Sequence, residues 1–167
     1  YAAGNVDSWA YPESKPSDDL YQGYTGQAGR ICGCIWFDNA AIRAALTGKT
    51  VNQASIRLTA HKYVGRGAAV TVHLRGTATE YEGRSGHPAL TTDYGAIGTA
   101  EPGTTVTLTI PNQAVTDLVN ETINGLMLYS EDVRDMEGRN YSQNYMRFDG
   151  GTSGTADTRP NLTVVYE

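Results

Sequence analysis

Apolar and polar residues alternate along several stretches of this chain, most clearly near its C-terminal end. Residues 125–129, 145–148 and 161–167 each carry an apolar residue at every second position. Successive side chains of a β-strand point to opposite faces of the sheet, so this period of two predicts strands with one buried and one solvated face. We therefore expect three consecutive β-strands, the last of which ties the end of the sequence into a sheet.

Similar patterns earlier in the chain predict four more strands and two short helices. Strands are expected over residues 31–37, 51–61, 70–74 and 105–110. Residues 39–46 place Ile42 and Leu46 on one side of a helix. That helix is expected to end at Gly48, and Asn112 is expected to cap the second one.

The remaining segments are richer in turn-forming residues. Residues 1–30 combine Pro, Gly, Ser and Asp with several aromatic residues, which is typical of a structured loop rather than of a linker. Residues 77–99 are polar and rich in glycine, and we expect a long loop there.

Together these elements predict an all-β fold, a single antiparallel β-sandwich of jelly-roll type with one or two short helices. The 167 residues suit one domain with its own core, spanning residues 1–167. Because Tyr1 is not an initiator residue, we expect this domain to be excised from a longer multidomain protein. The expected core consists of Trp36, Phe37, Ile56, Leu58, Val72, Leu74, Leu108, Leu126, Leu128, Phe148, Leu162 and Val164.

Charge and hydropathy argue against two classes of partner. The net charge is −5 and the basic residues are scattered rather than gathered in a stripe, so we expect no nucleic-acid binding. No run of apolar residues approaches the length of a membrane span, and we expect no membrane insertion.

Two cysteines lie two residues apart in the strand predicted over residues 31–37. On an extended strand Cys32 and Cys34 share one face about 6.5–7 Å apart, which is the limit of disulfide geometry. Two thiols with no further soft ligand nearby do not form a zinc site. We expect small side chains packed on one side of a strand, in a protein made in a reducing compartment.

Several segments occur in the order typical of a known family. They are Trp36-Phe37-Asp38-Asn39, then Ala54-Ser-Ile56-Arg-Leu58, and finally Arg159-Pro160-Asn-Leu162-Thr-Val164-Val-Tyr166. This order resembles the disaggregatase-related, or DNRLRE, domains, whose pattern is a strand ending in Phe-Asp, a short helix, Ala-x-Leu-x-Leu and a terminal Arg-Pro-x-Leu-x-Val-x-Tyr. Tyr94-Gly95-Ala96-Ile97-Gly98-Thr99 and Tyr145-Met146-Arg147 further resemble C-terminal domains of tail-associated structural proteins from phages of Gram-positive bacteria.

The resemblance covers residues 31–167 and rests mostly on structural motifs. It implies a jelly-roll β-sandwich that accompanies phage adhesion devices and cell-surface or polysaccharide-degrading proteins. In such proteins this domain often serves as a carbohydrate-binding module.

Residues that could perform catalysis form no recognisable motif. His61, His73 and His87 are the imidazoles, and no nucleophile-elbow pattern such as Gly-x-Ser-x-Gly is present. Glycosidase chemistry needs two carboxylates about 5–9 Å apart. The loop acids to consider are Glu80, Glu82, Glu131 and Asp132. Solvated loop charges are the simpler interpretation, and we expect that the domain is not an enzyme.

The aromatic residues favour a sugar ligand. Sugar rings stack on Tyr or Trp through their C–H faces, and their hydroxyls bond to Asp, Asn, Gln and Arg side chains. The chain has 11 tyrosines against 2 phenylalanines, a ratio that suits exposed positions. The candidates are Tyr21 and Tyr24, then Tyr141 with Arg139, and further Trp9, Tyr11 and Tyr81. Taken singly, each tyrosine also fits ordinary packing.

A cationic sheet face is the second candidate for binding. If residues 51–61 and 70–75 pair as a hairpin, Arg57 lies opposite Arg75 and Thr59 lies opposite His73, with His61 further along the same face. Like charges facing each other across strands destabilise the pair, so an acidic neighbour or ligand would compensate. This face suits an anionic glycan, or it is an ordinary solvated sheet face with arginine stems covering apolar surface.

Acidic residues gather in two places, at Asp18 with Asp19 and at Glu131 with Asp132. Hard oxygen ligands of this kind suit a structural calcium ion, although the second cluster lacks the spacing of an EF-hand loop. Solvated loop acids are the alternative, and we expect no other cofactor.

The sequence therefore predicts a non-catalytic carbohydrate-binding module of a phage tail or cell-surface protein. Its partner would be a polysaccharide of a bacterial envelope, and its location the virion or the cell exterior. The alternative is a structural capping or oligomerisation domain of a tail or fibre protein that binds no sugar. In that case exposed tyrosines would lie in a subunit interface.

Overall fold

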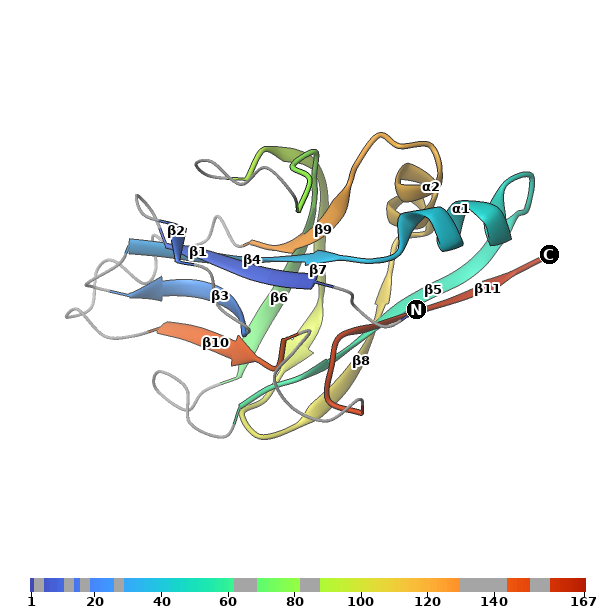
Figure 1. Ribbon diagram of the computed structural model, residues 1–167. Helices are drawn as coiled ribbons and strands as arrows, with labels where there is room; N and C mark the ends of the chain where they lie inside the picture. Colours follow the sequence, from blue (N-terminus) through green and yellow to red (C-terminus); the bar gives the residue numbers. More distant parts are fainter. Residues whose placement is uncertain are drawn as a thin grey trace.

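The computed structural model describes residues 1, 5–10, 14–15, 19–25, 29–61, 69–81, 88–129, 144–150 and 157–167. Within these residues two antiparallel β-sheets pack against each other, and two short helices lie at one end of the sandwich (Figure 1). The predicted all-β sandwich is thereby confirmed. Neither helix in the described ranges is long and apolar enough to cross a membrane.

The larger sheet has eight strands in the described part of the chain. They are β1 (Asn5–Ala10), β2 (Ser14–Lys15), β3 (Leu20–Thr25), β4 (Gly29–Trp36), β6 (Val70–Thr77), β7 (Leu90–Ala100), β9 (Gly125–Leu128) and β10 (Asn144–Phe148). Neighbouring strands follow the order β10-β3-β4-β9-β6-β7, and β1 pairs with both β2 and β4. The smaller sheet, in the order β11-β5-β8, is formed by β5 (Val51–Thr59), β8 (Thr105–Ile110) and β11 (Asn161–Tyr166).

Strand β10 connects the two sheets. Along its length it pairs with β3 in the larger sheet. Its end pairs with the residues that follow β5, because the His61 amide donates to the Arg147 carbonyl and the Asp149 amide donates to the Thr59 carbonyl, both at 2.9 Å. The ends of β3, β5 and β10 therefore meet where one sheet passes into the other.

Helix α1 (Asn39–Leu46) agrees with its sequence prediction. Asp38 caps it by accepting a bond from the Ala41 amide at 2.9 Å, and Ile42 and Leu46 are buried. Gly48 follows with a φ of 75°, the left-handed conformation that often ends a helix.

Helix α2 (Asn112–Val119) begins differently from the prediction. Its N-cap is Pro111, which makes no side-chain cap bond. Asn112 is not the cap, because its side-chain amide donates instead to the Val51 carbonyl of β5 at 2.8 Å. This bond attaches the helix to the smaller sheet, against which α2 packs beside α1 (Figure 1).

The apolar core between the sheets contains nearly all of the residues predicted for it. Phe37, Ile56, Leu58, Val72, Leu74, Leu108, Leu126, Leu128, Phe148 and Leu162 belong to one buried cluster. Val164 is only partly buried against it. Trp36 is buried on the opposite side of β4, with Met127 and the two cysteines. Strand β9 is therefore buried on both faces rather than solvated on one.

Both cysteines are free and buried, as expected for small packed side chains. Burial raises the pKa of the Cys34 thiol well above its ordinary value, and the neighbouring Cys32 contributes. The larger sheet thus has a second apolar cluster on its outer face, covered by Tyr81 and Tyr129.

Three further local predictions were wrong. Residues 77–99 are not one loop, because Leu90–Ala100 forms the longest of the described strands, β7, alongside β6. The first thirty residues contain β1, β2, β3 and the start of β4 rather than a loop. The hairpin of residues 51–61 with 70–75 does not form, since β5 and β6 belong to different sheets.

Candidate functional site

One face of the β3–β10 pair gathers polar and aromatic side chains. The register places Phe148 opposite Leu20 and Arg147 opposite Tyr21. Leu20 and Phe148 are fully buried in the core. Since alternate side chains of a strand share a face, the residues on either side of this pair face away from the core. We call the group the β3–β10 face; it consists of Asp19, Tyr21, Tyr145, Arg147, Asp149 and the adjoining His61.

The two tyrosines of this face are in contact. The ring centroids of Tyr21 and Tyr145 lie 5.8 Å apart, and the ring planes are tilted by 50°. Both residues are half-buried, so part of each side chain remains in contact with solvent. Tyr21 is one of the sugar-binding residues predicted from the sequence, whereas Tyr145 is not among them.

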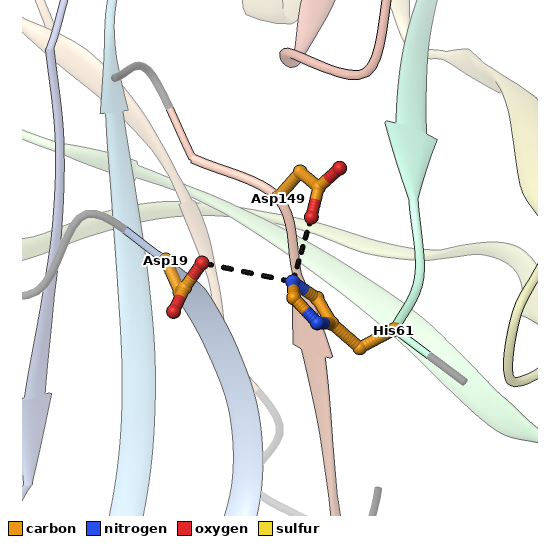
Figure 2. A group of neighbouring side chains, drawn as sticks. All are labelled: Asp19, His61 and Asp149. Carbon is orange, nitrogen blue, oxygen red and sulfur yellow. Dashed lines mark ion pairs between the residues drawn. The ribbon is translucent and has the colours of Figure 1, made fainter. Parts of the chain in front are cut away.

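Two carboxylates and one imidazole converge beside these rings. Asp19 immediately precedes β3, Asp149 immediately follows β10, and His61 follows β5 by two residues. His61 Nε2 lies 2.6 Å from Asp149 Oδ1 and 3.6 Å from Asp19 Oδ1. Figure 2 shows this nitrogen pointing into the space between the two carboxylates. One potential ligand atom from each residue lies within 4.8 Å of the other two.

Arg147 completes the electrostatics of the cluster. Its Nη2 lies 2.5 Å from Asp19 Oδ2, so Asp19 faces the guanidinium with one oxygen and the imidazole with the other. Like charges opposite each other at a strand end are unfavourable, and the Arg147 guanidinium offsets part of the repulsion between the carboxylates. The exposed fraction is 11% for the Asp19 side chain, 17% for Asp149 and 28% for His61. The Arg147 side chain is 39% exposed, so solvent reaches the cluster mainly from the histidine and arginine side.

The contact between His61 and Asp149 is close but poorly directed. His61 Nε2 is shielded from solvent and makes no hydrogen bond of acceptable geometry, although Asp149 Oδ1 is only 2.6 Å away. A buried polar nitrogen without a well-directed partner is unusual in folded proteins. Chemically, the cluster can hold a cation between two oxygens and one nitrogen, or it can present a carboxylate and a guanidinium to hydroxyl groups.

The other predicted site residues are dispersed. Tyr24 lies on β3 opposite Arg30, and Tyr81 packs its ring 5.4 Å from that of Trp36. Trp9 lies on β1 opposite Cys32. Tyr11, Asp18, Glu131, Asp132, Arg139 and Tyr141 lie outside the described residues.

The predicted cationic face is divided between the two sheets. Arg57 lies on β5 opposite Asn161 and Thr107, so it does not face Arg75. His73 lies opposite Ala96 on β7 and not opposite Thr59. Arg75 does have the acidic neighbour that the prediction required, because its Nη2 lies 2.8 Å from Asp93 Oδ2. His61 alone from this set joins the β3–β10 face.

Comparison with known proteins does not assign the chain to a family. No family model matches the chain. No curated protein is significantly similar to it. The resemblance to DNRLRE domains therefore stays a prediction from sequence motifs.

Proposed function

We propose that this domain is a non-catalytic carbohydrate-binding module and that the β3–β10 face is its sugar-binding site. The observation that supports this most strongly is the contact between the Tyr21 and Tyr145 rings on the same face as Arg147 and two carboxylates. Aromatic rings beside charged hydrogen-bonding groups are the combination that sugar recognition requires.

The ring geometry favours a particular mode of contact. Because the two planes are tilted by 50°, a single flat pyranose cannot stack on both rings at once. One ring stacks under the sugar and the other contacts its edge. Arg147 and Asp149 follow Tyr145 along the chain, two and four residues further on, and they can bond to hydroxyls at the rim.

The source of the glycan is proposed from the sequence resemblance. Phage tail and cell-surface proteins meet polysaccharides of bacterial envelopes, so we propose a virion or extracellular location and an envelope glycan as partner. Binding by one domain is expected to be weak, and several copies on one particle would raise the overall avidity.

The test measures both glycan binding and glycan cleavage with the intact domain. Binding is measured on a glycan array and by calorimetry with soluble cell-wall polysaccharide of Gram-positive bacteria. Replacing Tyr21 or Tyr145 with alanine is expected to weaken binding by about 1–3 kcal/mol, by analogy with lost aromatic stacking on a ring. Tyr166→Ala is the matched control, because Tyr166 is 43% exposed on β11 in the other sheet.

Three outcomes would contradict the proposal. The first is a folded wild-type domain that binds no glycan. The second is unchanged affinity in both Tyr21→Ala and Tyr145→Ala. The third is shortening of the polysaccharide during the assay, because Asp19 and Asp149 would then be acting as the paired carboxylates of a glycosidase.

A structural role is the second candidate, and one observation favours it. Val165 is 52% exposed and Tyr166 is 43% exposed on β11, an edge strand of the smaller sheet. Exposed apolar edge strands tend to pair with other chains. Under this hypothesis Val165→Lys dissociates an oligomer detected by light scattering, and neither form binds glycan.

A further inference from the structure

We infer that Asp19, His61 and Asp149 form a binding site for one divalent transition-metal ion of the zinc class. Nothing in this inference depends on sugar binding, so the metal can be tested without a glycan. The sequence pattern indicates a calcium ion as the occupant. Of these three residues, it indicates only Asp19 as a metal ligand. The structure adds a histidine and a second carboxylate from distant parts of the chain.

The distances between the donor atoms fit a small ion. Zinc binds histidine nitrogen and carboxylate oxygen at about 2.0–2.2 Å, which places tetrahedral ligand atoms about 3.4 Å from one another. His61 Nε2 and Asp19 Oδ1 are already 3.6 Å apart. His61 Nε2 and Asp149 Oδ1 are 2.6 Å apart, so a modest rotation of the Asp149 side chain would bring the distance between these two atoms to the value that zinc requires.

The second observation is the state of the imidazole nitrogen. His61 Nε2 is shielded from solvent and has no hydrogen bond of acceptable geometry, and it points between the two carboxylates (Figure 2). A protonated histidine held only by ion pairs would direct its N–H at an oxygen. A neutral histidine ligand instead directs its lone pair at a metal ion that lies between the three donors.

The surrounding charges favour a cation as the occupant. With a neutral imidazole, the two carboxylates outnumber the single guanidinium of Arg147. Arg147 binds Asp19 through Oδ2 and leaves Oδ1 facing the site. An outer partner of this kind orients a metal-binding carboxylate.

The donor set selects the class of metal. Calcium and magnesium take oxygen ligands, whereas imidazole suits zinc, copper, nickel and iron. Three protein ligands leave a fourth position of a tetrahedral ion open to water or to a ligand atom. The site also joins residues from the ends of β3, β5 and β10, so a bound ion would clamp the two sheets together.

The experiment uses tag-free protein treated with a chelator and then dialysed. Zn²⁺ is expected to bind with one-to-one stoichiometry by calorimetry and to raise the melting temperature, whereas Ca²⁺ does neither. Co²⁺ is expected to give the visible absorption of a protein-bound ion with nitrogen and oxygen ligands. His61→Gln should weaken Zn²⁺ binding at least about tenfold, since even outer-shell changes cost that much.

His73→Gln is the matched control, because His73 is also half-buried but lies on β6, away from the cluster. It should bind Zn²⁺ like the wild type. Zn²⁺ binding that is unchanged in His61→Gln overturns the inference, as does a wild type that shows neither a Zn²⁺-induced shift nor visible Co²⁺ absorption. Should His61→Gln fail to fold, Asp149→Asn takes its place, and the wild-type Co²⁺ spectrum still decides.

Discussion

Replacing Gly33 with alanine should separate β3 from β4 and disturb the β3–β10 face from beneath. A Cβ at position 33 would lie 2.9 Å from the Tyr21 amide nitrogen and 3.1 Å from its carbonyl oxygen, with Leu20 Cδ2 also at 2.9 Å. Backbone atoms cannot rotate away as a flexible side chain can. The alanine methyl group therefore forces the whole of β3 to shift.

The size of the effect follows from this overlap. Overpacking a tight site costs about 1–3 kcal/mol of unfolding free energy. For a domain of this length each kcal/mol lowers the melting temperature by about 2–4 °C, so we expect a loss of about 2–12 °C. The assay is thermal and urea unfolding, together with hydrogen exchange of the β3 and β10 amides, which should become faster.

Gly48→Ala is the control for this prediction. No atom lies within 4 Å of a Cβ at position 48, so only the positive φ of 75° opposes the substitution. Some stability should be lost, but amide exchange in β3 and β10 should not change. A Gly33→Ala domain with wild-type stability and wild-type exchange in β3 would refute the reasoning.

Two further predictions concern a partly buried tyrosine and a buried glutamine. Tyr94→Phe removes the bond from the Tyr94 hydroxyl to Asp117 Oδ2 at 2.7 Å and should cost about 1.5 kcal/mol in unfolding experiments. Burial and this bond raise the pKa of the Tyr94 hydroxyl above its ordinary value of 10.0. The stability that Tyr94 contributes is therefore complete below pH 10 and is lost as the pH rises further. If the stability of Tyr94→Phe falls just as much over this alkaline range, this explanation is contradicted. Gln22→Leu should destabilise the domain by about 2–3 kcal/mol, because the Gln22 side chain bonds the Thr71 carbonyl at 2.7 Å and the His73 amide at 2.9 Å. Gln53→Leu, at an exposed position on β5, should be nearly neutral in the same urea titration.

The elements with a regular pattern were predictable from sequence. The alternation in residues 145–148 correctly predicted a strand with one buried face, and Met146 and Phe148 are the buried residues. Tyr145 and Arg147 therefore lie on the other face. Strand β7 was missed because Gly95 and Gly98 interrupt its apolar pattern; both adopt positive φ, where the pairing with β6 is irregular. Glycines within a strand make its sequence look like that of a loop, although here they mark irregular pairing, or bulges, in the sheet.

The candidate site was less predictable, because it depends on pairing between distant segments. Asp19 and His61 each stand out in the sequence, yet no local pattern indicates that β10 pairs with both β3 and the end of β5. The assumption that consecutive strands are neighbours led to the incorrect hairpin of Arg57 with Arg75. The alternation of β10 could have indicated that Asp149 is the next residue on its outward face. It could not have indicated that Asp149 lies beside His61 and Asp19.

The most direct test of sugar binding at the β3–β10 face is an NMR titration of the isotope-labelled domain with soluble cell-wall polysaccharide. We predict that the largest shift changes occur at Tyr21, Tyr145 and Arg147, with little change on β7, which lies at the opposite edge of the larger sheet. Changes centred on β7 or on the exposed end of β11, or no changes at any glycan concentration, would contradict sugar binding at this face.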